Sequence, residues 1–489
     1  MQRKFLSSLF LIVLLNLLVK PFYILGIDAA VQNQVGEEVY GNYFALLNFS
    51  FLLNILLDLG ITNYNTRNIA QHPQLLVKHF YKILSIRIGL FFLYASFTLF
   101  SGLLIGFDQQ EFYLLAILIF NQFLVATIQF ARSNFGGLHL FKTDAIISVL
   151  DRLILIILCG LMLWTNVMGG KIQIEWFIYA QTIAYGLAAI ISISILSNKI
   201  GHLKIKLNKA FSAAILKRSF PYALLIFLMM MYNRVDAVMI ERLLADGNEQ
   251  SGIYAQGFRF LDAVNMFALL FAGMLLPIFA RLIKEKSDIR EMMELAIRIL
   301  LVASLTVGIF GYFYQETLIN ALYSNANQSS SVTFGLLILS FIPVSITYVF
   351  GTLLTANGSL KALNVMAVFG LIINVVLNII LIRSYKAEGA ALATLITQIF
   401  TALIQVILVY RIFKFKINLS LYAKIISFAT LIIGYLWFAT NTEWKVNPSI
   451  WLITFFIISP ILATILGLLK LSDLKMIFSG SIGEEDQTN

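Results

Sequence analysis

The sequence predicts an all-α membrane protein with about fourteen transmembrane helices, and three observations support this fold class. The chain has 489 residues, of which 60% are hydrophobic and only 12% are charged. Its mean hydropathy of +0.86 is typical of proteins that have the bilayer as their solvent. Apolar segments of roughly 20 residues, enough to cross a hydrocarbon core of about 30 Å, recur along the whole chain.

Fourteen segments fit this length. Those in the first half of the chain are 9–26, 43–60, 83–105, 112–130, 146–167, 176–196 and 220–240. Those in the second half are 253–279, 295–314, 332–354, 363–382, 390–412, 421–439 and 450–469. Counts of twelve or thirteen remain alternatives. Arg3 and Lys4 precede the first segment as in a signal peptide, but no clear small-residue cleavage site follows, so we expect this span to be retained.

The Lys and Arg residues of the connections predict the orientation of the bundle. With the N-terminus inside, 24 of the 35 lie on the cytoplasmic side and 6 lie within or at the edges of spans. The opposite side receives five, which are Lys171, Arg242, Arg383, Lys386 and Lys445. Both termini are therefore expected in the cytoplasm. The net charge of +10 is explained by short basic loops beside anionic lipid headgroups, so we expect no nucleic-acid partner.

The sequence lacks the residues that several kinds of chemistry require. The single cysteine, Cys159, lies inside an apolar segment and has no partner for a disulfide or a thiolate metal cluster. The chain has no GxxxxGK[ST] loop and no HExxH pair, and its short connections leave no room for an ATPase domain. We expect a protein that is not an enzyme and that has no cofactor and no metal centre.

An internal repeat divides the predicted spans into two lobes. The stretch GNYFA at 41–45, entering the second span, is echoed by GIYA at 252–255, entering the eighth. NFGGL at 134–138 has a counterpart in ANGSL at 356–360. Because the period is six spans, the halves are related by an axis along the membrane normal, and the site lies between them. We expect lobes at 1–205 and 206–417, with spans thirteen, fourteen and a cytoplasmic tail at 418–489.

Several further stretches carry a family resemblance. They are SFPY at 219–222, NRVDAVMI at 233–240, SGIYA at 251–255, GAALAT at 389–394, and LDLG at 57–60 followed by Thr66 and Arg67. In these stretches the chain resembles polysaccharide-export flippases of the multidrug/oligosaccharidyl-lipid/polysaccharide superfamily. The resemblance implies alternating-access flipping of a polyprenyl-diphosphate-linked oligosaccharide across a bacterial inner membrane, for O-antigen or capsule. Implied partners are this lipid-linked substrate, anionic membrane lipids and a polysaccharide polymerase.

Such a substrate requires a polar, cationic cavity, because unpaired charge in hydrocarbon costs several kcal/mol. Charged residues inside spans are the candidates, and Lys20, Arg234 and Arg259 lie inside spans one, seven and eight. Lys20 would lie about 17 Å from the start of its helix, close to the middle of the bilayer. Arg259 is three residues from Asp262 and can pair with it, whereas Arg234 and Asp236 point to different sides of a helix.

Other charged and helix-breaking residues have simpler predicted roles. Arg87 and Arg152 lie in the first turns of their predicted spans and are expected to reach the cytoplasmic headgroups. Pro21, Pro277 and Pro343 lie within or beside spans and predict bends.

Two other functions were weighed against the flippase. A cation-coupled multidrug antiporter of the same superfamily is expected to carry a carboxylate inside the first lobe, and the predicted first span offers Lys20 instead. Asp58, Asp236 and Asp262 are candidate ion-coupling sites, although no specific motif marks any of them. A membrane-embedded glycan polymerase or ligase needs a substantial external loop, and the predicted external loops are short.

The charge bias makes the topology testable. Reporter fusions or cysteine labelling should place Lys204 and Glu485 in the cytoplasm and Asn327 outside. Labelling of Lys204 and Asn327 from the same side would contradict the predicted orientation.

Overall fold

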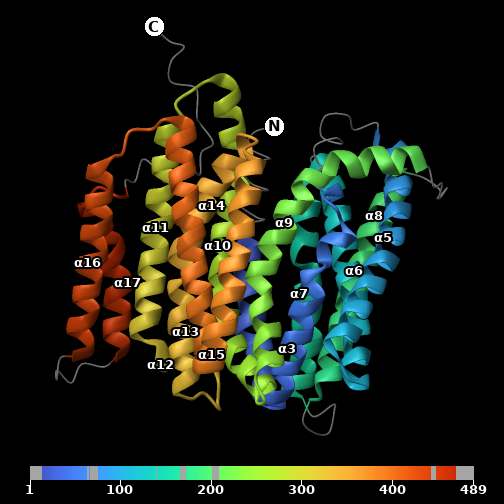
Figure 1. Ribbon diagram of the computed structural model, residues 1–489, viewed down its shortest axis with the longest axis horizontal. Helices are drawn as coiled ribbons and strands as arrows, with labels where there is room; N and C mark the ends of the chain where they lie inside the picture. The colour runs from blue at the N-terminus through green and yellow to red at the C-terminus, as the bar shows by residue number, and fades with distance from the viewer. Residues whose placement is uncertain are drawn as a thin grey trace.

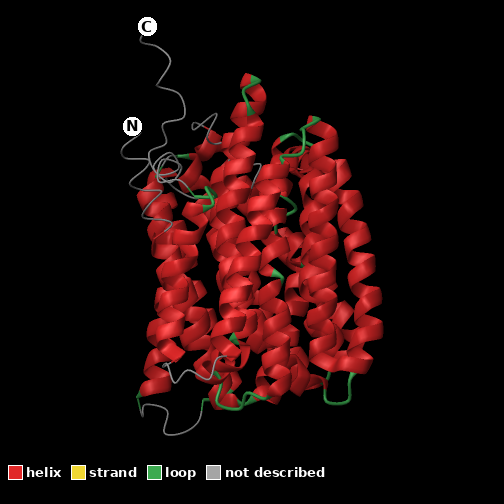
Figure 2. Ribbon diagram, turned by 90° about the vertical axis from the view of Figure 1, so that its left-hand side faces the viewer, coloured by secondary structure: helices red, strands yellow, loops and turns green. Residues whose placement is uncertain are grey.

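The computed structural model describes residues 14–62, 65, 75–138, 140–165, 172–200, 209–441 and 448–469. Within these residues the only regular elements are helices, which run roughly side by side through the molecule (Figure 2). Arg67, Lys204 and Glu485, which the sequence analysis names, lie outside the described residues.

The helices follow the predicted order of spans. The first half contains η1 (Tyr23–Asp28), α2 (Ala29–Val35), α3 (Glu37–Leu52), η2 (Asn54–Leu57), α5 (Leu75–Ile105), α6 (Gln109–Gly137), α7 (Phe141–Trp164) and α8 (Ile174–Ile200). The second contains α9 (Lys209–Leu243), α10 (Gly247–Glu285), α11 (Ile289–Phe313), α12 (Gln315–Leu322), α13 (Gln328–Leu339), α14 (Phe341–Ala356) and α15 (Leu360–Phe413). The helices α16 (Leu419–Asn441) and α17 (Pro448–Ile465) complete the chain.

The predicted membrane-spanning fold class is confirmed. Among the described residues, eleven helical stretches are long and apolar enough to cross a membrane. One of them, α15, changes direction at the non-helical Lys386 and therefore contains both predicted spans eleven and twelve. The shorter helices α3 and α17 occupy predicted spans two and fourteen, which accounts for all fourteen.

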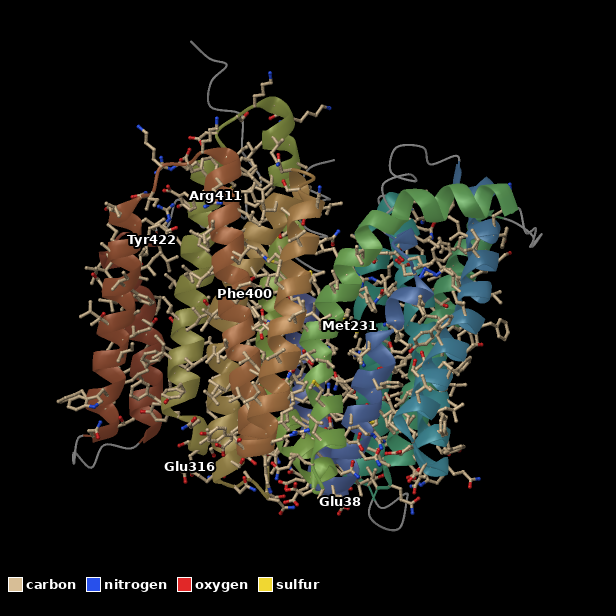
Figure 3. The ribbon with its side chains drawn as sticks, in the orientation of Figure 1. Glu38, Met231, Glu316, Phe400, Arg411 and Tyr422 are labelled. Atoms are coloured by element: carbon tan, nitrogen blue, oxygen red, sulfur yellow. The ribbon has the colours of Figure 1, made fainter. Side chains whose placement is uncertain are left out.

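The helices form two lobes with α16 and α17 at one edge (Figure 1). Helices α5 to α8 gather on one side and α10 to α15 on the other, while α3 packs against both α9 and α10 between them. Helices α16 and α17 pack on α11. We call the two ends of the bundle the Glu38 end and the Arg411 end, after residues labelled in Figure 3.

The first span differs from its predicted limits. It runs from Leu14 to Val35, well beyond the predicted end at residue 26, and contains a π-helical turn, η1, shortly after Pro21. Polar residues such as Asp28 and Gln32 lowered the local hydropathy, yet both are buried between helices. Packing within the bundle, rather than contact with lipid, allows this polar stretch to be part of a span.

The predicted second and tenth spans are also interrupted. The second begins at Glu37 and, beyond Leu52, continues as the short 3₁₀ helix η2. The tenth is divided at Ser340 into α13 and α14, three residues before Pro343. Helix α10 remains continuous through Pro277.

The two lobes meet most closely near the Glu38 end, where the repeated sequences face each other. A Cβ atom on Gly41 of α3 would lie 1.8 Å from the backbone oxygen of Asn248, and one on Gly252 of α10 would lie 2.2 Å from that of Glu37. The side chain of Gln32 also donates to the backbone oxygen of Gly252 over 2.9 Å. Only glycine permits this backbone approach, so the Glu38 end is closed.

We predict that Gly252→Ala opens the Glu38 end. The added methyl group meets backbone atoms, and overpacking of this kind costs about 1–3 kcal/mol, so the closed form should lose population about fivefold or more. Pulsed electron paramagnetic resonance between labels at Glu38 and Glu316, in a Cys159→Ser background, should report longer distances.

Gly273→Ala is the matched control, because it lies in the same helix and its Cβ would meet no atom within 4 Å. Identical distance distributions in both variants would contradict the closure.

Candidate functional site

A chain of four charged side chains joins the lobes, and we call it the ionic chain. In order it consists of Asp28, Arg259, Asp262 and Arg234. Arg259 Nε lies 2.6 Å from Asp28 Oδ2, and its Nη1 lies 3.9 Å from Asp262 Oδ2. Asp262 Oδ1 in turn lies 3.3 Å from Arg234 Nη2. Asp28 lies in η1 of the first span and the other three residues lie in α9 and α10, so the ionic chain links the two halves of the sequence.

The Asp28 end of the ionic chain is sealed from solvent. The side chains of Asp28 and Arg259 are 1% and 11% exposed. Tyr40 donates its hydroxyl to Asp28 over 2.6 Å, and the Arg259 guanidinium lies 5.0 Å from the ring centre of Phe44. Neither charge can be left alone here, because removing one partner of a buried pair costs about 3–5 kcal/mol.

The Arg234 end is more open. The side chains of Arg234 and Asp262 are 21% and 22% exposed. Arg234 also donates to Asn48 Oδ1 of α3 over 3.3 Å and lies about 5 Å from the ring centres of Phe51 and Phe258. Its polar contacts are at 3.3 Å or more, and Asp262 also lies near Arg259. An incoming anion can therefore reach this guanidinium more easily than that of Arg259.

Lys20 belongs to a separate cluster in the first lobe. The charged groups that act on it are Arg132, Arg152, Asp144 and Asp151. Arg132 lies near the end of α6 and Asp144 in the first turn of α7, which places Lys20 toward the Arg411 end rather than beside the ionic chain. The structure therefore does not bring Lys20 together with the other two predicted cations.

Arg152 does not extend to a headgroup as expected. Its guanidinium lies 4.7 Å from the ring centre of Tyr23 and donates to the hydroxyl of Tyr185 over 2.6 Å. Tyr23 is on the π-helical turn of the first span, so Arg152 links α7 to the element that also carries Asp28.

Arg87 is buried and forms an ion pair with the partly exposed Asp58. Both terminal nitrogens of Arg87 lie 2.9 Å from Asp58 Oδ1, and one also donates to the backbone oxygen of Ala126. Arg87 is 2% exposed, so the expectation that it reaches the headgroups is wrong. Asp58 also accepts a hydrogen bond from the hydroxyl of Thr62, and its charge is already compensated within the first lobe.

Asp236 is held only by neutral donors. Its carboxylate, which is 1% exposed, accepts hydrogen bonds from Asn378 over 2.6 Å, Thr394 over 2.5 Å and Tyr254 over 2.9 Å. Asn374 lies beside them, accepting from Asn378. No Lys or Arg among the described residues forms an ion pair with Asp236. This carboxylate therefore differs from those of the ionic chain.

Comparison with known proteins identifies the family. Residues 5–283 match the model of a family described as polysaccharide biosynthesis protein. The chain belongs to the polysaccharide biosynthesis protein family. It is also 30% identical over 204 residues to an uncharacterized membrane protein of Methanocaldococcus jannaschii, a match that covers 42% of this chain and 48% of that protein. The chain thus spans about half the length of this curated relative.

Solved structures share the fold of this polysaccharide biosynthesis protein. The lipid II flippase MurJ in an inward closed conformation has a TM-score of 0.68 at 15% identity, covering 95% of this chain and 99% of that one. An inward-facing multidrug resistance transporter, whose title places it in the MOP superfamily, has a TM-score of 0.61 at 13% identity, covering 79% of this chain and 93% of that one. At these identities the likeness shows that the chain shares the fold of these membrane proteins.

A third solved structure is that of a superfamily transporter from Pyrococcus furiosus, whose title describes a binding pocket of reverse polarity. It has a TM-score of 0.54 at 14% identity and covers 83% of this chain and 92% of that one.

Sequence reasoning named Arg234, Arg259 and Asp262 as site candidates, and the structure brings these three side chains together in the ionic chain. Sequence reasoning missed Asp28, the nearer partner of Arg259, because the predicted first span ended two residues earlier, at Gly26. A search for a carboxylate in the polar extension of that segment would have found it.

We predict that Asp28→Ala destabilises the protein by about 3–5 kcal/mol, because Arg259 loses its buried counter-charge. Chemical unfolding in detergent measures this loss. The double variant Asp28→Ala/Arg259→Ala should be less destabilised than the two single losses added together.

The control is Glu285→Ala, which breaks the exposed pair with Arg281 and should cost less than about 1 kcal/mol. Equal losses of stability in Asp28→Ala and Glu285→Ala would rule out a stabilising Asp28–Arg259 pair. So would a loss in the double variant equal to the sum of the losses in Asp28→Ala and Arg259→Ala.

Proposed function

We propose that the protein flips a polyprenyl-diphosphate-linked oligosaccharide from the cytoplasmic to the outer leaflet of a bacterial inner membrane. In this proposal the Arg411 end and both termini are cytoplasmic, and the cargo supplies repeat units of a surface polysaccharide. The observation that carries the proposal is the partly exposed Arg234 at the lobe interface of a polysaccharide biosynthesis protein.

Arginine suits the diphosphate for a chemical reason. Its planar guanidinium offers paired N–H donors that match two phosphate oxygens and keeps its charge at any physiological pH. Asp262, which Arg234 contacts over 3.3 Å, occupies that position in the absence of cargo. Asn54 of η2 is partly exposed and follows Phe51, which lies against Arg234, by three residues. It donates to the buried Gln122 of α6 over 3.2 Å and offers a polar group for a sugar hydroxyl.

The ionic chain also couples binding to movement. When the Glu38 end opens, Asp28 and Arg259 must separate because they lie on different lobes. A diphosphate bound by Arg234 displaces Asp262, which can then pair more closely with Arg259 and lower the cost of that separation. Without cargo, Asp262 stays shared between the two arginines. Alternating access then follows from competition between Asp28 and Asp262 for Arg259.

A cation-coupled multidrug antiporter remains the second candidate, and Asp28 is the observation that favours it. The predicted first span lacked the intramembrane carboxylate expected of such an antiporter, whereas the span in the structure contains one. Against this function, Asp28 is paired with Arg259 and sealed, so it has no free negative charge to offer a drug cation.

The amount of glycan at the cell surface tests the role of the cationic residues. Lys20→Ala and Arg234→Ala should abolish export while folded protein remains at normal levels, because each removes a positive charge that faces the cargo's path. Arg281→Ala is the control, since its exposed side chain pairs with Glu285 outside the interface. Normal surface glycan in both cavity variants would remove these residues from the mechanism.

Asp236 is our proposed site for a coupling proton or sodium ion. A buried carboxylate without a cationic partner among the described residues gains stability by taking up either one. Asp236→Asn should make flipping in proteoliposomes independent of pH and sodium gradients, whereas Asp246→Asn, which breaks the exposed contact with Lys386, should not. Unchanged ion dependence in Asp236→Asn would refute the assignment without affecting the cargo site.

A further inference from the structure

A groove opens on the outer face of the second lobe, away from the ionic chain. It has a volume of about 580 Å³ and runs between the two antiparallel halves of α15. Ala362, Met366 and Phe369 line it from the first half, and Phe400, Ile404 and Leu408 from the second. Phe400 and Arg411, both labelled in Figure 3, mark the extent of the second half from mid-bundle toward the Arg411 end.

The walls of this α15 groove face lipid. Val365 and Phe369 are more than half exposed, and the neighbouring Leu403 is 58% exposed. Exposed apolar side chains on a membrane-spanning helix contact hydrocarbon rather than water. Ala362 adds depth because its short side chain leaves space between the helices. The body of the α15 groove therefore suits an apolar chain.

One end of the α15 groove is polar and cationic. Gly358, Ser359 and Lys361 line it there, at the start of α15. The first α-helical bond of α15 runs from Leu363 N to Ser359 O, so the preceding amide N–H groups have no acceptor within the helix, and Ser359 provides no side-chain cap. Lys361 forms no ion pair with any described carboxylate. Free amides and an ammonium group together favour a phosphate.

We propose that the α15 groove binds an anionic phospholipid of the surrounding membrane, with an acyl chain along the apolar walls and its phosphate at Lys361. The charge and the apolar channel are complementary to the two parts of one lipid molecule. The site is separate from the proposed cargo path, since none of its lining residues belongs to the ionic chain or to the donors that hold Asp236.

Native mass spectrometry of the purified full-length protein, titrated with phosphatidylglycerol and with phosphatidylcholine, tests the proposal. The wild-type protein should bind phosphatidylglycerol more tightly. Lys361→Glu should weaken phosphatidylglycerol binding by about fivefold or more and abolish the preference, because a lysine near anionic lipid is lost. Ala362→Trp, which fills the α15 groove, should weaken both lipids.

Lys284→Glu is the matched control, since Lys284 is an exposed lysine in the last turn of α10, away from the α15 groove. It should leave the preference unchanged, and unfolding temperatures should confirm that all variants fold. Unaltered phosphatidylglycerol binding in both groove variants would overturn the proposal. A dimer that Ala362→Trp dissociates would overturn it too, by assigning the α15 groove to a second copy of the chain.

Discussion

The arrangement of the lobes depends on one buried ion pair, Arg259 with Asp28. Two charges 2.6 Å apart, both shielded from solvent, must stay together unless another partner replaces one of them. Their separation into different lobes means that this electrostatic requirement acts on the whole bundle. The close glycine contacts between α3 and α10 and the hydrogen bond from Tyr40 to Asp28 hold the same elements together.

In the proposed function, the same requirement links the binding of an anionic cargo to movement of the lobes. The ionic chain contains two arginines and two aspartates, so it is electrically balanced while the Glu38 end is closed. An anionic cargo changes that balance and favours a different arrangement of the lobes. A cationic drug would need to displace an arginine from a sealed aspartate, which is a less favourable exchange.

Hydropathy and charge alone predicted the number of spans and the fold class, because lipid imposes a length and a composition on each helix that it surrounds. Hydropathy ended the first span too early, because Asp28 and Gln32 are polar residues that are buried among other helices and do not contact lipid. Local spacing paired Arg259 with Asp262, three residues away, but the closer partner came from another lobe.

Contacts between side chains that are distant in the sequence could not be predicted either. Arg87 meets Asp58 through a turn that hydropathy does not describe, and Asp236 receives its donors from Asn378 and Thr394 on either side of the reversal in α15. Side-chain partners across helices depend on helix rotation and packing, which a single sequence leaves open.

The central claim is that the cargo is an anionic lipid whose own charge crosses the membrane. The most direct test is the transbilayer movement of a polyprenyl-diphosphate oligosaccharide in proteoliposomes under an imposed potassium-diffusion potential, at fixed pH and sodium. The cargo carries about two negative charges, and the potential contributes about 2.3 kcal/mol per charge per 100 mV. The cargo should therefore cross faster when the starting side is negative and slower when the potential is reversed. A rate indifferent to voltage but steep in proton or sodium gradient would contradict the account and indicate an antiporter.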